Sequence, residues 1–104
     1  MMNNWRGKKV TPETALKRMI KQALGYQGWF VWPVIQSIGS YPGAPDLIAH
    51  KGGVTLNIET KAPKGKQSPA QLEFERQITE HGCVYIVCRS YEDIEANDAF
   101  KRAK

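Results

Sequence analysis

Hydrophobic side chains recur along the first third of the chain with the spacing of a helix. Between residues 12 and 24, apolar positions return every three or four residues, which is the pattern of a helix with one buried face. Thr11 and Pro12 are residue types favoured at a helix start, and Gly25 is of the type that ends one. We therefore predict a first helix over residues 12–24.

The next two segments have the composition of strands. Residues 29–38 are rich in aromatic and β-branched side chains, although Pro33 makes the strand an edge or interrupts it. After a loop rich in glycine and proline, residues 46–50 form a short strand, and the glycines at 52–53 turn the chain back. These segments predict two neighbouring strands joined to a third by a tight turn.

Strict alternation of side chains marks the third strand, over residues 54–61. In this alternation Glu59 and Lys61 occupy the same face. Residues 83–88 are nearly all apolar, as in a strand covered on both faces. Helices are predicted over residues 68–80 and 90–100.

The predicted order is helix, three strands, helix, strand, helix. This order predicts an α/β fold in which helices flank a mixed central sheet. A length of 104 residues corresponds to a single domain, spanning residues 1–104, with a basic N-terminal arm at 1–10 and a basic tail at 101–104.

The charge balance favours a polyanionic partner. The chain has fifteen Lys and Arg residues and ten Asp and Glu residues, so its formal net charge is +5. A positive charge of this kind favours binding to nucleic acid or to an anionic membrane surface. No stretch approaches the ~20 apolar residues of a membrane span, and the N-terminus lacks a secretion signal. We therefore expect a cytoplasmic protein that binds nucleic acid and no membrane.

Against this basic background, two acids and a lysine are placed for phosphodiester hydrolysis. Asp46 and Glu59 carry the hard oxygen ligands that hold Mg²⁺, and the backbone carbonyl of Thr60 would add a third. Lys61 would orient the attacking water or stabilise the developing anion. The alternative is structural: Asp46 in a turn, and Glu59 with Lys61 as a solvated charge pair on a strand face.

Two further residues have both a structural and a functional interpretation. Gln71 forms the sequence of a capping box with Ser68, yet it also lies on the inward face of its helix. Glu13 would favour its helix N-terminus electrostatically, yet it lies along the buried stripe and points inward.

Four short motifs follow one another along the chain: GAPDL at 43–47, IETK at 58–61, SPAQL at 68–72 and GCVY at 82–85. In order and spacing they resemble the motifs of the VRR-NUC nucleases, a family of the PD-(D/E)xK, restriction-endonuclease-like superfamily. The resemblance extends from about residue 13 to residue 90. It implies an αβββαβ core, dependence on Mg²⁺ or Mn²⁺, and cleavage of DNA.

The resemblance also implies a role for each matching residue. Asp46 and Glu59 would be metal ligands and Lys61 the catalytic lysine. Gln71 would be the helix glutamine near the site. Glu13 would be the acid of the first helix, acting on the metal directly or through a metal-bound water.

Basic residues near these motifs are candidates for DNA binding: Lys64 and Lys66 after the catalytic strand, and Lys17, Arg18 and Lys21 along the first helix. They are either ordinary solvated charges or contacts to DNA phosphates, and phosphate contacts would make binding strongly salt-dependent.

The chain resembles the free-standing VRR-NUC members from viruses and bacteria, which are symmetric dimers that cut four-way junctions. We therefore expect a homodimer that resolves branched DNA, Holliday junctions first, in recombination or repair within a bacterial or phage-infected cell. A symmetric pair of cuts requires two sites, and one chain supplies one. The alternatives are a DNA-binding subunit without catalysis and a restriction-like enzyme that cuts a defined duplex sequence.

Overall fold

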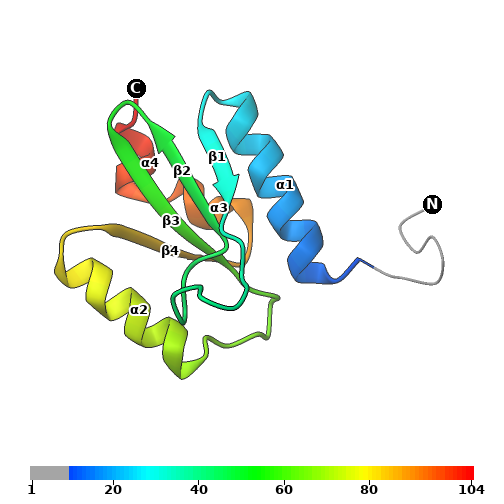
Figure 1. The fold of residues 1–104 in the computed structure, drawn as a ribbon. Coiled ribbons are helices and arrows are strands. Elements are labelled where there is room, and N and C mark those ends of the chain that lie inside the picture. Colours follow the sequence, from blue (N-terminus) through cyan, green and yellow to red (C-terminus); the bar gives the residue numbers. More distant parts are fainter. Residues whose placement is uncertain (1–9) are drawn as a thin grey trace.

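The computed structural model describes residues 10–104, so the proposed basic arm at 1–10 lies, apart from Val10, outside the described residues. Within 10–104, four strands form one mixed sheet in the order β1-β2-β3-β4 (Figure 1). They are β1 (Phe30–Pro33), β2 (Leu47–Lys51), β3 (Val54–Thr60) and β4 (Val84–Cys88). The first three are antiparallel neighbours, whereas β4 runs parallel to β3.

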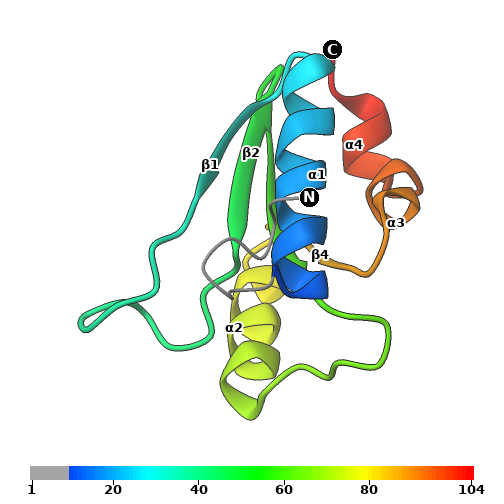
Figure 2. The same ribbon diagram turned by 90° about the vertical axis from the view of Figure 1, so that its right-hand side faces the viewer.

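A parallel pair requires a crossover, and helix α2 (Pro69–Glu80) provides it. The other helices are α1 (Pro12–Tyr26), α3 (Tyr91–Glu95) and α4 (Asp98–Arg102). Figure 2 shows α3 and α4 on the side of the sheet where α1 lies. The mixed sheet and its helices confirm the predicted α/β, restriction-endonuclease-like fold.

The hydrophobic core lies between one face of the sheet and these three helices. It consists of Ile20, Leu24, Trp29, Leu47, Ala49, Leu56, Ile58, Ile86, Cys88, Ile94 and Ala99. The indole of Trp29 stacks on Phe100 with ring centroids 5.6 Å apart, which ties the C-terminal helix to the start of β1. Helix α2 lies on the other face, where Phe74 contacts Tyr85 of β4.

The first helix and the first strand differ from the prediction at their ends. Helix α1 continues through Gly25 to Tyr26, and the glycine with the left-handed backbone is instead Gly28, at φ +90°. A glycine costs a helix only about 1 kcal/mol, so the helix continues past it. Strand β1 ends at Pro33 rather than at residue 38.

The predicted C-terminal helix over residues 90–100 is two short helices. The side chain of Asn97 accepts hydrogen bonds from the backbone N–H groups of Ala99 and Phe100, and so starts α4 separately from α3. This is the competition between a short polar side chain and the helical backbone. Of the predicted basic tail, Lys101 and Arg102 form the last turn of α4.

Among residues 10–104, no helix has the length and the apolar character that crossing a membrane requires.

Candidate active site

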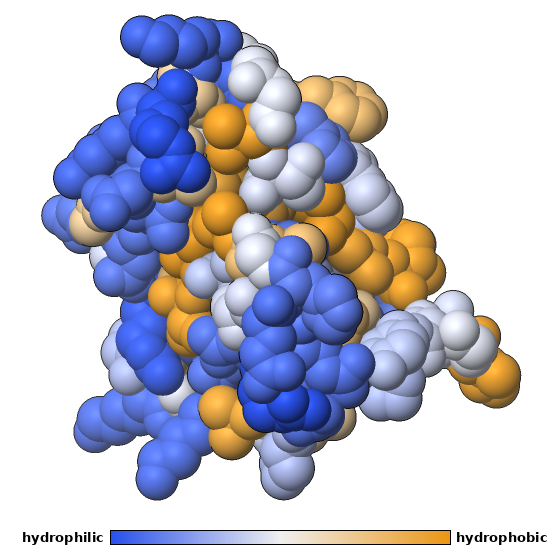
Figure 3. Space-filling model, turned by 90° about the vertical axis from the view of Figure 1, so that its left-hand side faces the viewer, coloured by the Kyte–Doolittle hydropathy of each residue, from blue (hydrophilic) through white to orange (hydrophobic). Residues whose placement is uncertain are grey.

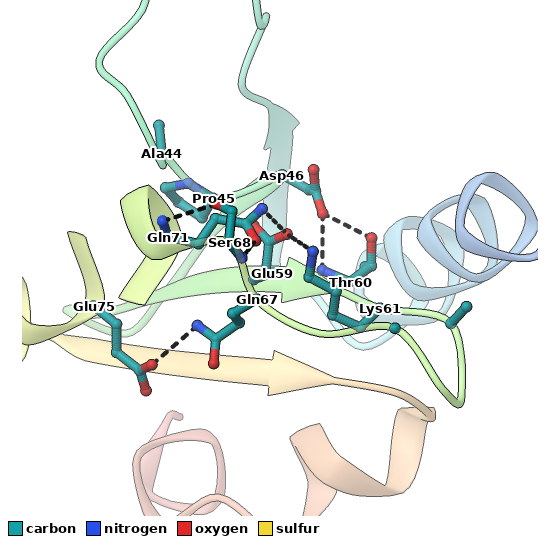
Figure 4. A network of polar contacts seen from close by, with 12 residues as sticks. Ala44, Pro45, Asp46, Glu59, Thr60, Lys61, Gln67, Ser68, Gln71 and Glu75 are labelled. Carbon is teal, nitrogen blue, oxygen red and sulfur yellow. Dashed lines mark hydrogen bonds and ion pairs between the residues drawn. The ribbon is translucent and has the colours of Figure 1, made fainter. Parts of the chain in front are cut away.

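Two carboxylates meet where β2 begins and β3 ends. Leu47 pairs with Ile58 across these antiparallel strands, so Asp46, just before β2, lies beside Glu59 (Figure 4). The backbone N–H of Asp46 donates to the carbonyl of Ile58 at 2.9 Å. The sheet therefore brings together two acids that are thirteen residues apart in the sequence.

Thr60 holds the carboxylate of Asp46 in place. Asp46 Oδ2 accepts hydrogen bonds from the Thr60 backbone N–H at 2.8 Å and from Thr60 Oγ1 at 2.7 Å. Figure 4 shows the other oxygen of Asp46 directed away from Thr60. One oxygen thus orients the group, and the second remains for a ligand.

Glu59 is almost completely buried, with 2% of its surface exposed. Its Oε2 accepts a hydrogen bond from Gln71 Nε2 at 2.7 Å and lies 3.6 Å from Lys61 Nζ. Its Oε1 is buried and has no hydrogen-bond partner within residues 10–104. Burial, and after it the charge of Asp46, raise the pKa of Glu59 from 4.5 to about 7, although Lys61 opposes the shift.

Lys61 is 9% exposed and is held by the backbone as well as by its charge. Its N–H donates to the carbonyl of Cys88 at 3.0 Å, which extends the pairing of β3 with β4 past Thr60. Glu59 and Lys61 share a face, as the alternation predicts, but they are buried. The alternative of a solvated charge pair is therefore wrong for these two residues.

Gln71 forms the predicted capping box and also contacts Glu59. Its Oε1 accepts from the backbone N–H of Ser68 at 2.9 Å, and Ser68 Oγ accepts from the backbone N–H of Gln71 at 3.2 Å, which completes a capping box. Its Nε2 remains free to donate to Glu59. The start of α2 is thereby tied to the end of β3.

A glycine allows the loop before Asp46 to approach α2 this closely. Gly43 has φ +81°, and a Cβ at this position would lie 2.1 Å from the carbonyl oxygen of Ala70. Only a residue without a side chain fits there. The first motif of the sequence therefore contributes a close backbone contact as well as Asp46.

Glu13 lies across a cavity from these strands. The cavity, of about 320 Å³, is lined by Thr11, Pro12, Glu13, Thr14, Lys17, Asp46, Thr60 and Ala62. Thr11 caps α1 by accepting from the backbone N–H of Thr14. The carboxylate of Glu13 is therefore positioned by the first turn of α1, on the Asp46 side of the site.

The basic candidates are distributed over three places. Lys17 is half-buried and lines the cavity with Asp46, while Lys64 and Lys66 are exposed on the loop that follows Lys61. Arg18 and Lys21 line a separate hollow along α1, together with Gln22, Gly25 and Tyr26.

Sequence reasoning missed Arg89. Its Nη1 donates to the carbonyls of Ala62 at 2.9 Å and of Gly65 at 2.7 Å, and so holds the loop after Lys61. Nothing in the local sequence indicates this role, because Arg89 follows β4 and meets the loop only in the folded chain.

The oxygens at this site fit a hard divalent cation. An unpaired buried carboxylate oxygen is costly, and Glu59 Oε1 is one beside a second carboxylate, that of Asp46. Within residues 10–104, no three Asp, Glu, His or Cys side chains form a metal-binding group. Two carboxylates suffice for Mg²⁺, which keeps several of its waters.

No protein-family model and no curated protein matches the chain. Among solved structures, the chain is similar to one described as "VRR_NUC domain", with a TM-score of 0.71 and 25% sequence identity, over 82% of this chain and 91% of the other. The chain has the VRR-NUC domain fold. This confirms the family to which the four motifs point, and the VRR-NUC fold supports a nuclease-type function.

Proposed function

We propose that this VRR-NUC domain is a divalent-metal-dependent DNA endonuclease that acts as a homodimer on branched DNA, with four-way junctions as the first substrate to test. The observation that carries the proposal is the buried, unpartnered Oε1 of Glu59 beside Asp46 and Lys61. Burying an acid without a full set of partners destabilises a protein, so such acids concentrate at functional sites.

The ligands to Mg²⁺ or Mn²⁺ would be Asp46, Glu59 and the carbonyl of Thr60, with Glu13 acting through a water. When bound, the cation would neutralise negative charge on the phosphate and lower the pKa of a water molecule bound to it. Thr60 orients Asp46, and Gln71 orients Glu59. Lys61 would orient the attacking water or stabilise negative charge on the transferring phosphoryl group.

The exposed aromatic residues of β1 support a homodimer. Phe30 is 67% exposed, although it lies within a strand, and its ring stacks on His50 of β2 at 6.1 Å between centroids. Trp32, 41% exposed, lies beside the same imidazole with ring centroids 6.4 Å apart, and its Nε1 donates to His50 Nε2 at 3.0 Å. An uncovered aromatic surface of this kind favours a protein interface, and a two-fold partner would supply the second active site.

A labelled four-way junction incubated with Mg²⁺ or with EDTA tests the activity. We expect the junction to be nicked in Mg²⁺ and to stay intact in EDTA. Equal binding in both conditions without nicking would favour a non-catalytic DNA-binding subunit. A linear duplex of the same sequence distinguishes a junction-specific enzyme from a restriction-like enzyme, since the latter would cut both substrates.

Replacing Lys61 tests the assignment of the catalytic residue. We expect Lys61→Ala to lower the rate of cutting by at least about 10²-fold while junction affinity changes little, because one buried positive charge is lost from the reacting centre. Lys101→Ala, a matched removal of an exposed lysine on α4, should cut at the normal rate. Turnover retained by Lys61→Ala would remove this residue from the mechanism.

A further inference from the structure

The connection between β1 and β2 carries an aliphatic side chain that the fold does not use. Ile38 is fully exposed, and Ile35 and Tyr41 on the same connection are 71% and 59% exposed. An isoleucine left in water forgoes the stabilisation that burial of its side chain provides. Such a residue on a basic domain suggests contact with a partner.

This connection is stiffened by its own side chains. Ser40 Oγ accepts from the backbone N–H of Ser37 at 2.7 Å and donates to the carbonyl of Ile35 at 2.9 Å. Gln36 Nε2 donates to the carbonyls of Ala44 and Pro45, both at 3.3 Å. The bonds fasten the two ends of the connection together and hold Ile38 out at its tip.

Both ends of the connection also lie at the active site. The backbone N–H of Val34 donates to the carbonyl of Asp46 at 2.9 Å, and Pro45 precedes Asp46 directly. Figure 2 shows this connection and the loop after β3 projecting at the same end of the sheet, on opposite sides of the molecule. The second loop starts at Lys61 and carries Lys64 and Lys66.

The site therefore lies between a cationic loop and an apolar one. Lysines on one side can bind the phosphates of a nucleic acid strand, whereas the apolar tip on the other side cannot bind phosphates. Apolar side chains on projecting segments instead enter between base pairs, where they separate stacked bases and bend the duplex.

We propose that Ile38 is an apolar wedge that enters DNA next to the phosphodiester bond that the site cleaves. The proposal rests on the nuclease function argued above and adds a specificity-determining residue to it. Ile38 would contact bases and not the reacting atoms. It would favour DNA whose bases separate easily, such as the branch point of a junction, over a fully stacked duplex.

A second copy of this chain is the rival occupant. Figure 3 shows hydrophobic side chains in the middle of one face as well as on the projecting connection. The broad surface formed by Phe30 and Trp32 suits a dimer interface. The narrow tip at Ile38, placed opposite Lys64 and Lys66, suits DNA.

The test measures base opening separately from cutting. Four-way junctions carry 2-aminopurine at successive positions around the branch, and fluorescence is recorded on binding in EDTA, where cutting does not occur. Wild-type protein should raise the fluorescence at one or two positions. Ile38→Leu should retain the rise, Ile38→Ser should lose most of it, and Leu72→Ser, an exposed leucine on α2, should retain it.

In Mg²⁺, Ile38→Ser should cut a fully paired junction about tenfold more slowly than wild type, because the cost of separating bases is no longer offset. An unpaired base placed at the opened position should restore its rate to within about twofold of wild type. Thermal unfolding of Ile38→Ser should match wild type, since the side chain packs against nothing.

Three results would overturn the wedge. They are the absence of a fluorescence rise with wild type, an equal rise with Ile38→Ser, and a shift of Ile38→Ser from dimer to monomer in sedimentation, which would assign the tip to a second copy. Base opening without cutting would instead refute the nuclease function and leave the wedge standing. Cutting without base opening would refute the wedge and leave the nuclease function standing.

Discussion

At the scale of single residues, the cost of burying Glu59 links structure and chemistry. The carboxyl is removed from water, has one oxygen bonded by Gln71 and one without a partner, and faces a second acid. These conditions favour its protonated form when no cation is present. A cation bound there would favour the ionised form, so metal binding should release a proton near neutral pH.

This shift predicts how stability depends on pH. The pKa of Glu59 is raised from 4.5 to about 7 on folding, so the folded state binds more protons than the unfolded state between these values. Without metal, the free energy of unfolding should therefore fall as pH rises through this window, by up to about 3 kcal/mol. Urea unfolding in EDTA across the window measures this change.

Glu59→Gln provides the comparison, because the amide imitates the protonated acid. Its stability should vary less between pH 4.5 and about 7, and it should exceed that of wild type above the window. Parallel profiles for the two proteins would show that Glu59 does not hold a raised pKa.

Gly43 leads to a second prediction at this scale. Gly43→Ala places a Cβ against the Ala70 carbonyl and forces a non-glycine residue to adopt φ +81°. The backbone strain alone should lower the free energy of unfolding by about 1–3 kcal/mol. Gly53→Ala is a useful control, because it has the same φ of +81° and no atom within 4 Å of the added Cβ. A loss no larger than that of the control would exclude the close contact.

At the scale of elements, the start of α2 has a structural task and a proposed functional one, and one side chain is placed for both. Ser68 caps the helix, while Gln71 caps it and also bonds Glu59. The capping box was readable from the sequence, since it depends on residues three apart. The bond to Glu59 was not, because it spans the loop after Lys61, which is held by Arg89 from beyond β4.

Two substitutions at the start of α2, one at the N-cap and one within the helix, should separate these tasks. Ser68→Ala should lower the free energy of unfolding by about 1 kcal/mol and leave the affinity for Mn²⁺ nearly unchanged. Gln71→Ala should lower both, because Glu59 loses the donor that orients it. Urea unfolding and calorimetric titration with Mn²⁺ measure the two effects. Equal affinities for the two variants would limit Gln71 to capping.

At the scale of the whole molecule, the proposed activity depends on pairing two copies. A single domain presents one site at one end of its sheet, and paired cuts require a second site related by symmetry. The aromatic surface of β1 and β2 is the part of the described chain best suited to form that contact.

Phe30→Asp tests this arrangement. A charge in the centre of an apolar interface should convert the dimer to a monomer, as measured by sedimentation equilibrium. The monomer should keep its affinity for Mn²⁺, because Phe30 lies away from Asp46 and Glu59. Paired cuts across a junction should become single nicks. If Phe30→Asp were still dimeric, the interface would lie elsewhere.

The sequence by itself determined the order of the elements, the capping of α1 and α2, and the shared face of Glu59 and Lys61. These depend on residues close together in the chain, where periodicity and side-chain type suffice. The tertiary structure alone decided the burial of Glu59, the restraint of Asp46 by Thr60, and the hold of Arg89 on the loop after Lys61. These features depend on segments far apart in sequence meeting at one place, which no local pattern encodes.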